Sequence, residues 1–334
     1  MRAGGGSVKK RMLLFAVLPV LAAVILLGAC SRGEAEVTAF IMDTTAVIKV
    51  EGGEAQSTAE QIADAAASLE KMCLSRTVPG SDVFSLNSAG EAQVSEKTAS
   101  VIRTALDVGE KSGGALDIGL GALSDLWSVK ERTAPPAKNE IAPLLNPERG
   151  IAQSGGKITL SGGAVLDLGS VGKGAACDEA AAILKESTAK RASVSFGGSV
   201  LFFGDGEFTF GIADPEKGSA GYIATVTTGE GFISTSGTYE RYFDYNSIRY
   251  HHIIDPVSGY PVQNHLVSVT VFAGGGALSD ALSTACFVLG EEKGGALAGK
   301  YGAGCVFVFD DGTVKATGEI KNRIQITDDN YHLD

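Results

Sequence analysis

Two oxygen-bearing side chains lie four residues apart in the stretch SDALSTACFVLG, Ser279 to Gly290. If this stretch is helical, Asp280 and Thr284 share one face with Cβ atoms about 5–6 Å apart, close enough to bind one cation. A carboxylate and a neutral hydroxyl suit Mg²⁺ better than Zn²⁺, especially where substrate phosphates complete the coordination shell. The alternative is that Ser279 or Asp280 caps the helix and Thr284 bonds its preceding carbonyl. The stretch alone favours capping.

A glycine-punctuated turn precedes a helix in LDLGSVGKGAACD. Gly169, Gly172 and Gly174 would let the backbone approach a ligand closely. The helix N-terminus and Lys173 would offer positive charge to a phosphate. The spacing matches neither GxxxxGKS/T nor GxGxxG, so the regular phosphate-loop fingerprints do not apply. Taken alone, the stretch favours a tight turn with a solvated lysine.

Two of the four histidines are adjacent in RYHHIIDPVSGYPV. On a regular strand His251 and His252 point to opposite faces, so one of them faces inward, where it can serve as a base beside Asp255. Adjacent histidines on a strand cannot both point at one ion, which argues against a zinc site. The alternative is that Asp255 caps its own backbone in the turn DPVSG, and the isolated motif slightly favours that interpretation.

A further aspartate lies in the apolar run KSGGALDIGLGALSDLW, which also contains the only tryptophan, Trp127. Here Asp117 follows Ala115 and Leu116. A polar side chain in such a run needs a partner, either a backbone turn or a ligand. The turn is the commoner answer.

Hydrophobic periodicity predicts the elements that must position these residues. Helical spacing occurs in STAEQIADAAASLEKMCLS, in EKTASVIRTALDVGEKSGG and from about Gly174 to Lys190. Strands are predicted in FIMDTTAVIKV, RASVSFGGSVLFFG, EFTFGIAD, GYIATVTTG, GFISTSG, RYHHIID, LVSVTVFA and GCVFVFDDGTVKATG, with a hairpin around KITLSGGAVLDLG. Strands and helices mix without strict alternation, internal repeat or strong domain break. The fold class is therefore α+β, or mixed α/β.

Composition narrows the function. The 334 residues are 44% hydrophobic, enough for one large domain or two small ones with a core. The net charge of −11 argues against a nucleic-acid partner, which needs clustered Lys and Arg. Four cysteines have no metal-like spacing and are interpreted as core thiols: Cys73, Cys177, Cys286 and Cys305.

The N-terminus has the pattern of an export signal. Basic residues precede the apolar run from Met12 to Leu27, which is short for a membrane span, although an uncleaved anchor is the alternative. The ending LGAC resembles the lipobox of bacterial lipoproteins, in which Cys30 would be diacylated. The expected organisation is a signal peptide at 1–29, a tether at 30–38 and a domain at 39–334. The domain would be exported and lipid-anchored on the periplasmic or extracytoplasmic face of a bacterial membrane.

Taken together and in order, the motifs resemble the ApbE family, the FAD:protein FMN transferases: SGGALD, LDLGSVGKGAACD, VSFGGS, STSGTYERYF, RYHHIIDPVSGYPV and LVSVTVFA…DALSTACFVLG. The resemblance covers roughly Phe40 to Gly290. It implies an α+β fold with mixed sheets flanked by helices and an FAD site in a cleft between subdomains. The implied activity is Mg²⁺-dependent cleavage of FAD, release of AMP and attachment of FMN to a threonine. The acceptor would be a flavoprotein such as a subunit of a redox-driven ion pump.

The resemblance also implies roles for single residues. Mg²⁺ would be held by Asp280, Thr284 and the backbone carbonyl of Ser170. A threonine hydroxyl needs a base to become a nucleophile, and His252 is expected to be that base, with Asp255 orienting either the ring or the loop. The expected FAD contacts are Met42, Ala115, Leu116, Asp117, Asp167, Lys173 and Ile253, with Tyr239 and Tyr242 as further lining. Asp43 stands where the family usually has glycine.

Two other functions stay open. An FAD pyrophosphatase would use the same site, with water in place of the threonine. A lipoprotein that binds a flavin without chemistry would need neither a base nor a complete set of oxygen ligands, so the presence of both argues against it.

Overall fold

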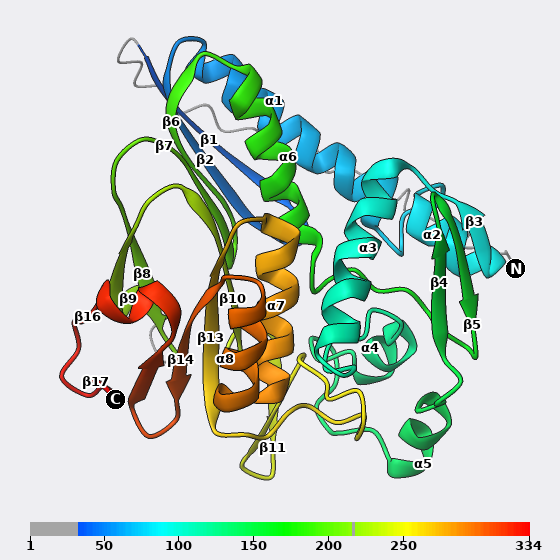
Figure 1. Cartoon of the computed structure of the whole chain (residues 1–334). Coiled ribbons are helices and arrows are strands. Elements are labelled where there is room, and N and C mark those ends of the chain that lie inside the picture. Colours follow the sequence, from blue (N-terminus) through cyan, green and yellow to red (C-terminus); the bar gives the residue numbers. More distant parts are fainter. Residues whose placement is uncertain (1–32, 216–217) are drawn as a thin grey trace, which may run out of the picture.

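The computed structural model describes residues 33–215 and 218–334, and its fold is α+β, as predicted (Figure 1). A nine-stranded sheet runs through the molecule in the order β1-β2-β6-β7-β10-β13-β14-β15-β17. The pair β15 and β17 is parallel, and the other neighbours are antiparallel. The strands are β1 Glu34–Ile41, β2 Thr44–Gly52, β6 Ala189–Phe196, β7 Ser199–Gly204, β10 Gly231–Gly237, β13 Leu266–Ala273, β14 Gly304–Phe309, β15 Thr313–Ala316 and β17 His332–Leu333.

The segment predicted as one strand, FIMDTTAVIKV, forms the end of β1, a tight turn and most of β2. Ile41 pairs with Thr44, so Met42 and Asp43 make the turn, with φ of 53° and 61°. This geometry matches the twist of a two-residue hairpin. Because β1 begins at Glu34, residues 34–38 belong to the sheet, and their assignment to a tether is corrected.

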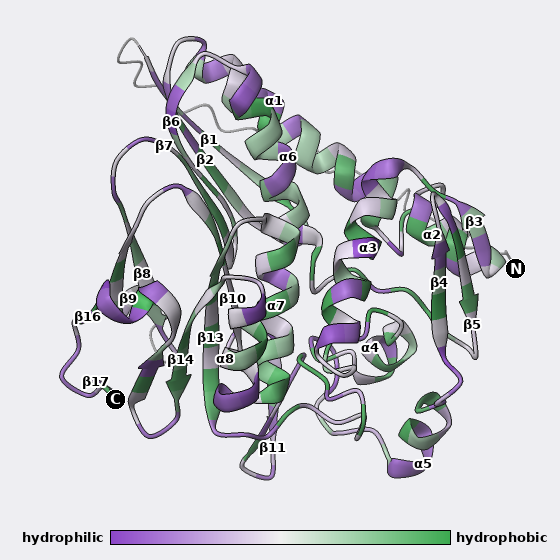
Figure 2. Ribbon diagram, in the orientation of Figure 1, coloured by the Kyte–Doolittle hydropathy of each residue, from purple (hydrophilic) through white to green (hydrophobic). Residues whose placement is uncertain are grey.

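The middle of the sheet is buried on both faces. On one face pack the helices α1 Ala55–Leu69, α6 Gly172–Glu186, α7 Gly276–Leu289 and α8 Glu291–Lys300 (Figure 1). Helix α3 Glu96–Lys111 packs against α7 and adds its buried residues to the same core. On the other face lies a three-stranded sheet of β8 Phe208–Asp214, β9 Gly218–Thr228 and β16 Ile324–Ile326. Strand alternation explains the two cores: Leu201 joins the helix side, whereas Val200 and Phe202 join the opposite side. Figure 2 shows the apolar residues along α7 and β13.

A smaller group of elements lies beside the helices. It comprises α2 Asp82–Ala89, β3 Glu91–Gln93, α4 Gly121–Trp127, α5 Lys138–Ile141, η2 Ala142–Leu144, β4 Gly150–Ser154 and β5 Lys157–Ser161 (Figure 1).

Trp127 joins this group to the histidine segment. Its ring packs on Phe243 and Tyr250 of the hairpin formed by β11 Tyr242–Tyr245 and β12 Ile248–His251. It also meets Tyr260 edge-on, at 5.6 Å between ring centroids. The indole Nε1 donates to the carbonyl of Gly259 at 2.7 Å. The only tryptophan is therefore buried with its one donor satisfied.

Two local predictions are corrected, and one is confirmed. The hairpin was predicted around KITLSGGAVLDLG. It is instead formed by β4 and β5, which are joined by a turn at Gly155 and Gly156. The helix expected from Gly174 to Lys190 spans Gly172–Glu186, because the chain from Ala189 pairs into β6. The four cysteines are buried and free, as predicted.

Within residues 33–215 and 218–334, no helix is both long and apolar enough to cross a membrane. The predicted signal peptide and Cys30 lie outside the described residues.

Candidate active site

The N-terminal turns of α6 and α7 cross at a pair of glycines. A Cβ atom on Gly174 would lie 2.0 Å from the carbonyl oxygen of Gly276, so no side chain fits there. An aspartate of each helix binds the free N–H groups of the other. Asp280 Oδ2 accepts from Gly174 N at 2.7 Å, and the Asp178 carboxylate accepts from Gly276 N and Ala277 N at 2.7 and 2.8 Å. The role of Gly174 is thus close helix packing, which the sequence analysis had not assigned to it.

The capping interpretation of SDALSTACFVLG is wrong for both candidate residues. Helix α7 begins at Gly276, so Ser279 and Asp280 lie inside its first turns. Ser279 Oγ donates to the Gly276 carbonyl at 2.9 Å, while Asp280 caps α6 instead of its own helix. The Thr284 hydroxyl bonds Ser236 Oγ at 3.3 Å and not a preceding carbonyl.

Asp280 is 5% exposed, and each of its carboxylate oxygens accepts one hydrogen bond. The second donor is Ser199 Oγ, 2.6 Å from Oδ1. A carboxylate oxygen has two lone pairs, so one on each oxygen remains for a cation. Ser170 lies two residues before α6, and Asp280 is bonded to Gly174 in the first turn of that helix.

Asp178, Cys177 and Glu240 lie near enough to feel the charge of Asp280, but they do not form a ligand cluster with it. Among the residues that the structure describes, no group of three or more His, Cys, Asp or Glu could hold a metal ion. A cation bound here would rely on one carboxylate, neutral oxygens and the oxygens of a substrate. That donor set fits Mg²⁺, which keeps few protein ligands and shares substrate phosphates.

The two histidines differ in their surroundings. His251 is buried: its Nδ1 accepts from Ile253 N at 3.2 Å, so its Nε2 donates to the carbonyl of Val262 at 2.8 Å. Burial lowers the pKa of His251 to about 4. His252 Nδ1 is enclosed and has no hydrogen-bond partner among the described residues. Burial, followed by the positive charge of Arg241, lowers the pKa of His252 to about 3, so the ring is neutral near pH 7.

Asp255 organises the turn that follows the histidines. Its carboxylate accepts from Val257 N at 3.0 Å and Ser258 N at 3.3 Å, and its backbone N–H donates to the Tyr260 carbonyl at 2.9 Å. Gly259 N closes the turn onto the Asp255 carbonyl. Of the two roles expected for Asp255, the contacts are those of orienting the loop.

Glu240 and Arg241 lie near the candidate site residues, and the sequence motifs did not predict a role for either. Glu240 is partly exposed to solvent, but the surrounding protein desolvates its carboxyl group, and this desolvation raises its pKa. The positive charges of Lys173 and Arg241 act in the opposite direction and lower it. A Cβ atom on Gly198 would lie 3.0 Å from Glu240 Oε1, so the glycine leaves room for the carboxylate. The charges of Arg241 and Lys173 also act on His252, so these four side chains share one region. In the sequence, the adjacent charged residues Glu240 and Arg241 within STSGTYERYF could have indicated a role for this segment.

Among the predicted FAD contacts, Asp117 has both a turn and a side-chain partner. Its Oδ1 accepts from Gly119 N at 2.7 Å, and its Oδ2 accepts from Arg149 Nη2 at 2.7 Å. Arg149 follows 32 residues later and was not predicted. Ala115 and Leu116 are buried beside it.

Asp167 and Arg76 connect the glycine turn to α4. Asp167 Oδ1 accepts from Gly169 N at 2.9 Å, which shapes the turn. Its Oδ2 lies 3.7 Å from Arg76 Nε, and Arg76 also donates to the Gly121 carbonyl and pairs with Asp125.

The β1–β2 turn is tied to neighbouring segments. Met42 N donates to Glu70 Oε2 at 2.9 Å. Asp43 pairs with Lys130 and, at 3.3 Å, with Arg241, and the hydrogen bond from Lys130 lowers the pKa of Asp43. Asp43 therefore links the Met42 turn to the segment that carries Glu240.

The other predicted lining residues divide between core and surface. Ile253 is 4% exposed and packs in the core. Burial raises the pKa of Tyr239 to about 12. Tyr242 is 40% exposed, and the Arg249 guanidinium lies 3.9 Å from its ring centroid.

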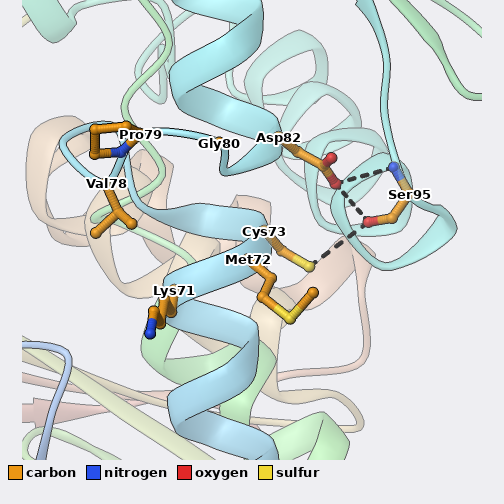
Figure 3. A pocket seen from close by; sticks show the side chains of 8 residues that line it. All are labelled: Lys71, Met72, Cys73, Val78, Pro79, Gly80, Asp82 and Ser95. Atoms are coloured by element: carbon orange, nitrogen blue, oxygen red, sulfur yellow. Dashed lines mark hydrogen bonds between the residues drawn. The ribbon is translucent and has the colours of Figure 1, made fainter.

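One pocket lies outside this group of residues, and a second borders it. The first, of about 360 Å³, is formed by the π-helical turn η1 Glu70–Leu74 and the segment after it (Figure 3). Asp82 on its wall accepts from Ser95 N at 2.9 Å and Ser95 Oγ at 2.6 Å, and no predicted site residue lines it. The other, of about 120 Å³, is bounded by Gly119 and Arg149, the two partners of Asp117.

Known proteins share both the sequence and the fold. The model of the ApbE family matches residues 42–307. The FAD:protein FMN transferase of Treponema pallidum is 34% identical over an alignment of 292 positions that covers 79% of this chain and 81% of that protein. The FAD:protein FMN transferase of Rhodobacter capsulatus is 34% identical over an alignment of 267 positions that covers 76% of this chain and 51% of that longer relative. The crystal structure of the ApbE protein from Thermotoga maritima superposes with a TM-score of 0.77 at 30% identity, covering 86% of this chain and 97% of the other.

Proposed function

This chain belongs to the ApbE family, and we propose that it is an FAD:protein FMN transferase that requires Mg²⁺ and modifies a threonine of an acceptor flavoprotein. The assignment as a flavin transferase follows from the relatives named FAD:protein FMN transferase. The metal and the acceptor threonine are the finer parts of the proposal.

The observation that carries the proposal is the position of Asp280 at the start of α6, one helical turn before Thr284 on α7. Asp280 keeps one lone pair free on each oxygen and is bonded to the helix that follows the Ser170 turn. Asp280, Thr284 and the Ser170 carbonyl would hold Mg²⁺. When bound, the ion would stabilise negative charge that builds on the phosphate oxygens.

The proposed transfer replaces the phosphoanhydride bond of FAD by a phosphoester bond to the acceptor. The acceptor threonine Oγ forms a bond to the phosphorus of the FMN half, the bridging P–O bond of the pyrophosphate breaks, and AMP leaves. His252 takes the hydroxyl proton on Nε2, because its Nδ1 is enclosed. Neutral imidazole is the form required of a base, and the low pKa of His252 keeps it neutral. A bound anionic pyrophosphate would raise that pKa and strengthen the base.

The test is to incubate the mature protein with FAD, Mg²⁺ and an acceptor domain carrying the target threonine. Protein-linked flavin together with AMP is the expected result, and a variant acceptor with Thr→Val is the matched control. Free FMN and AMP without linked flavin would identify a pyrophosphatase. Intact FAD would identify a flavin-binding protein.

The proposal includes export. A lipid on Cys30 would hold the domain at the outer face of the membrane, where an exported flavoprotein, such as a subunit of a redox-driven ion pump, is the proposed acceptor. The basis is the LGAC sequence behind an apolar run. Radiolabelled palmitate should label the wild-type chain in cells and should not label Cys30→Ser.

A further inference from the structure

Each of the two side chains proposed as metal ligands is hydrogen-bonded to a serine of the central sheet. Ser199 at the start of β7 donates to Asp280, and Ser236 on β10 bonds Thr284. We propose that Ser199 and Ser236 are positioning residues that aim protons away from the cation, so that Asp280 and Thr284 present lone pairs to it. The inference rests on the proposed metal site.

The direction of the hydroxyl protons at Thr284 follows from counting donors. Ser283 Oγ donates its single proton to the carbonyl of Asp280 at 2.9 Å, because a carbonyl can only accept. The bond of 2.8 Å between Ser236 and Ser283 must then use the proton of Ser236. The bond of 3.3 Å between Ser236 and Thr284 must in turn use the proton of Thr284. The Thr284 hydroxyl therefore points its proton into the sheet and keeps its lone pairs free.

Ser199 acts in the same sense on the carboxylate. It is 1% exposed, and its hydroxyl must donate because a carboxylate only accepts. Gly174 N–H donates to the other oxygen, so the two hydrogen bonds together fix the orientation of the Asp280 carboxylate. Partners behind metal ligands typically change metal affinity about 10–100-fold when removed, although they never touch the ion.

The same helix and strand contain a matched control. One turn earlier, Ser279 donates to the Gly276 carbonyl at 2.9 Å, and Ser234 on β10 bonds Ser279 at 2.8 Å. Because Ser279 uses its proton on the carbonyl, Ser234 must donate to Ser279. No proposed metal ligand takes part in this series of hydrogen bonds. Ser234→Ala removes a buried hydroxyl of the same kind from the same interface.

The test measures binding of Mn²⁺ alone by electron paramagnetic resonance, using the mature wild-type protein and its Ser199→Ala, Ser236→Ala and Ser234→Ala variants. We expect the Kd for Mn²⁺ to rise about 10-fold or more in Ser199→Ala and in Ser236→Ala. It should stay at the wild-type value in Ser234→Ala. Thr284→Val marks the effect of losing the ligand itself, and circular dichroism with thermal unfolding verifies that each variant is folded.

Each serine is judged by its own variant. An unchanged Kd in Ser236→Ala or Ser199→Ala overturns the role of that serine, and an equal rise in Ser234→Ala overturns both. Should Ser199→Ala fail to fold, Ser236→Ala still tests the idea, because Ser283 keeps its bond to the Asp280 carbonyl. A wild-type protein that binds no Mn²⁺ and cleaves FAD without divalent metal would instead refute the metal site of the proposed function.

Discussion

At the scale of single residues, Asp280 has two tasks that the sequence presents as alternatives. It caps a helix, but that helix is α6 and not its own, and the same carboxylate keeps lone pairs for a cation. The structural role and the proposed metal-binding role therefore fall on one side chain. Its substitution should affect stability as well as activity.

Asp280→Ala leaves Gly174 N–H and the Ser199 hydroxyl without an acceptor, so the free energy of unfolding should fall by about 1–3 kcal/mol. Asp280→Asn retains an oxygen for one of these donors and should lose less stability. Both variants should lose Mg²⁺-dependent cleavage of FAD. Urea denaturation and AMP release measure the two effects. Wild-type stability in Asp280→Ala would argue against the cap, and full activation of Asp280→Asn by Mg²⁺ would argue against the metal role.

His252→Ala should bind FAD normally and lose the transfer step, because the neutral ring is needed only to accept the threonine proton. Flavin fluorescence quenching measures binding, and in-gel flavin fluorescence of the acceptor measures transfer. His265→Ala, an exposed histidine paired with Asp310, is the control. Unchanged turnover in His252→Ala would remove this residue from the mechanism.

At the scale of elements, local patterns predicted most helices and strands but not the contacts between them. The period of SDALSTACFVLG indicates α7, and the glycines of LDLGSVGKGAACD indicate a turn before α6. No local pattern could pair Asp280 with Gly174 or Ser199, because these partners lie 106 and 81 residues away along the chain. Arg149, bonded to Asp117, was missed for the same reason.

The crossing of α6 and α7 should tolerate no side chain. Gly174→Ala places a Cβ atom 2.0 Å from a backbone carbonyl, so the helices must separate, and we expect a loss of about 3 kcal/mol or more in unfolding free energy. Gly299→Ala in α8 is the matched control, since open space surrounds that position and alanine favours a helix by about 1 kcal/mol. Thermal unfolding compares the two. A Gly174→Ala protein as stable as the wild type would contradict this packing.

At the scale of the whole molecule, buried neutral histidines link stability to pH. His251 has a folded pKa of about 4, below the value of about 6.5 expected in the unfolded chain. Between these two pH values the imidazole is protonated in the unfolded state and neutral in the folded state. The contribution of His251 to the unfolding free energy is therefore full above the unfolded-state pKa and decreases as the pH falls toward the folded-state pKa.

The unfolding free energy of the wild type should therefore fall more steeply between pH 6 and pH 4.5 than that of His251→Gln. The expected difference in slope is about 1.4 kcal/mol per pH unit, the value for one proton. Glutamine can still donate to Val262 and accept from Ile253, and the carboxylates are common to both proteins. Urea denaturation at several pH values measures the slopes, and parallel slopes would show that His251 titrates normally in the folded state.

The reciprocal capping of α6 and α7 has a consequence for the order of folding. Neither helix start is satisfied until the other is present, and the two lie 98 residues apart in the chain. While a chain is still being synthesised, or crosses a membrane unfolded, the Asp280 carboxylate cannot yet accept from Gly174 N–H. The proposed site would therefore form late, so that an unfinished chain has no means of cleaving the FAD of the compartment in which it is made.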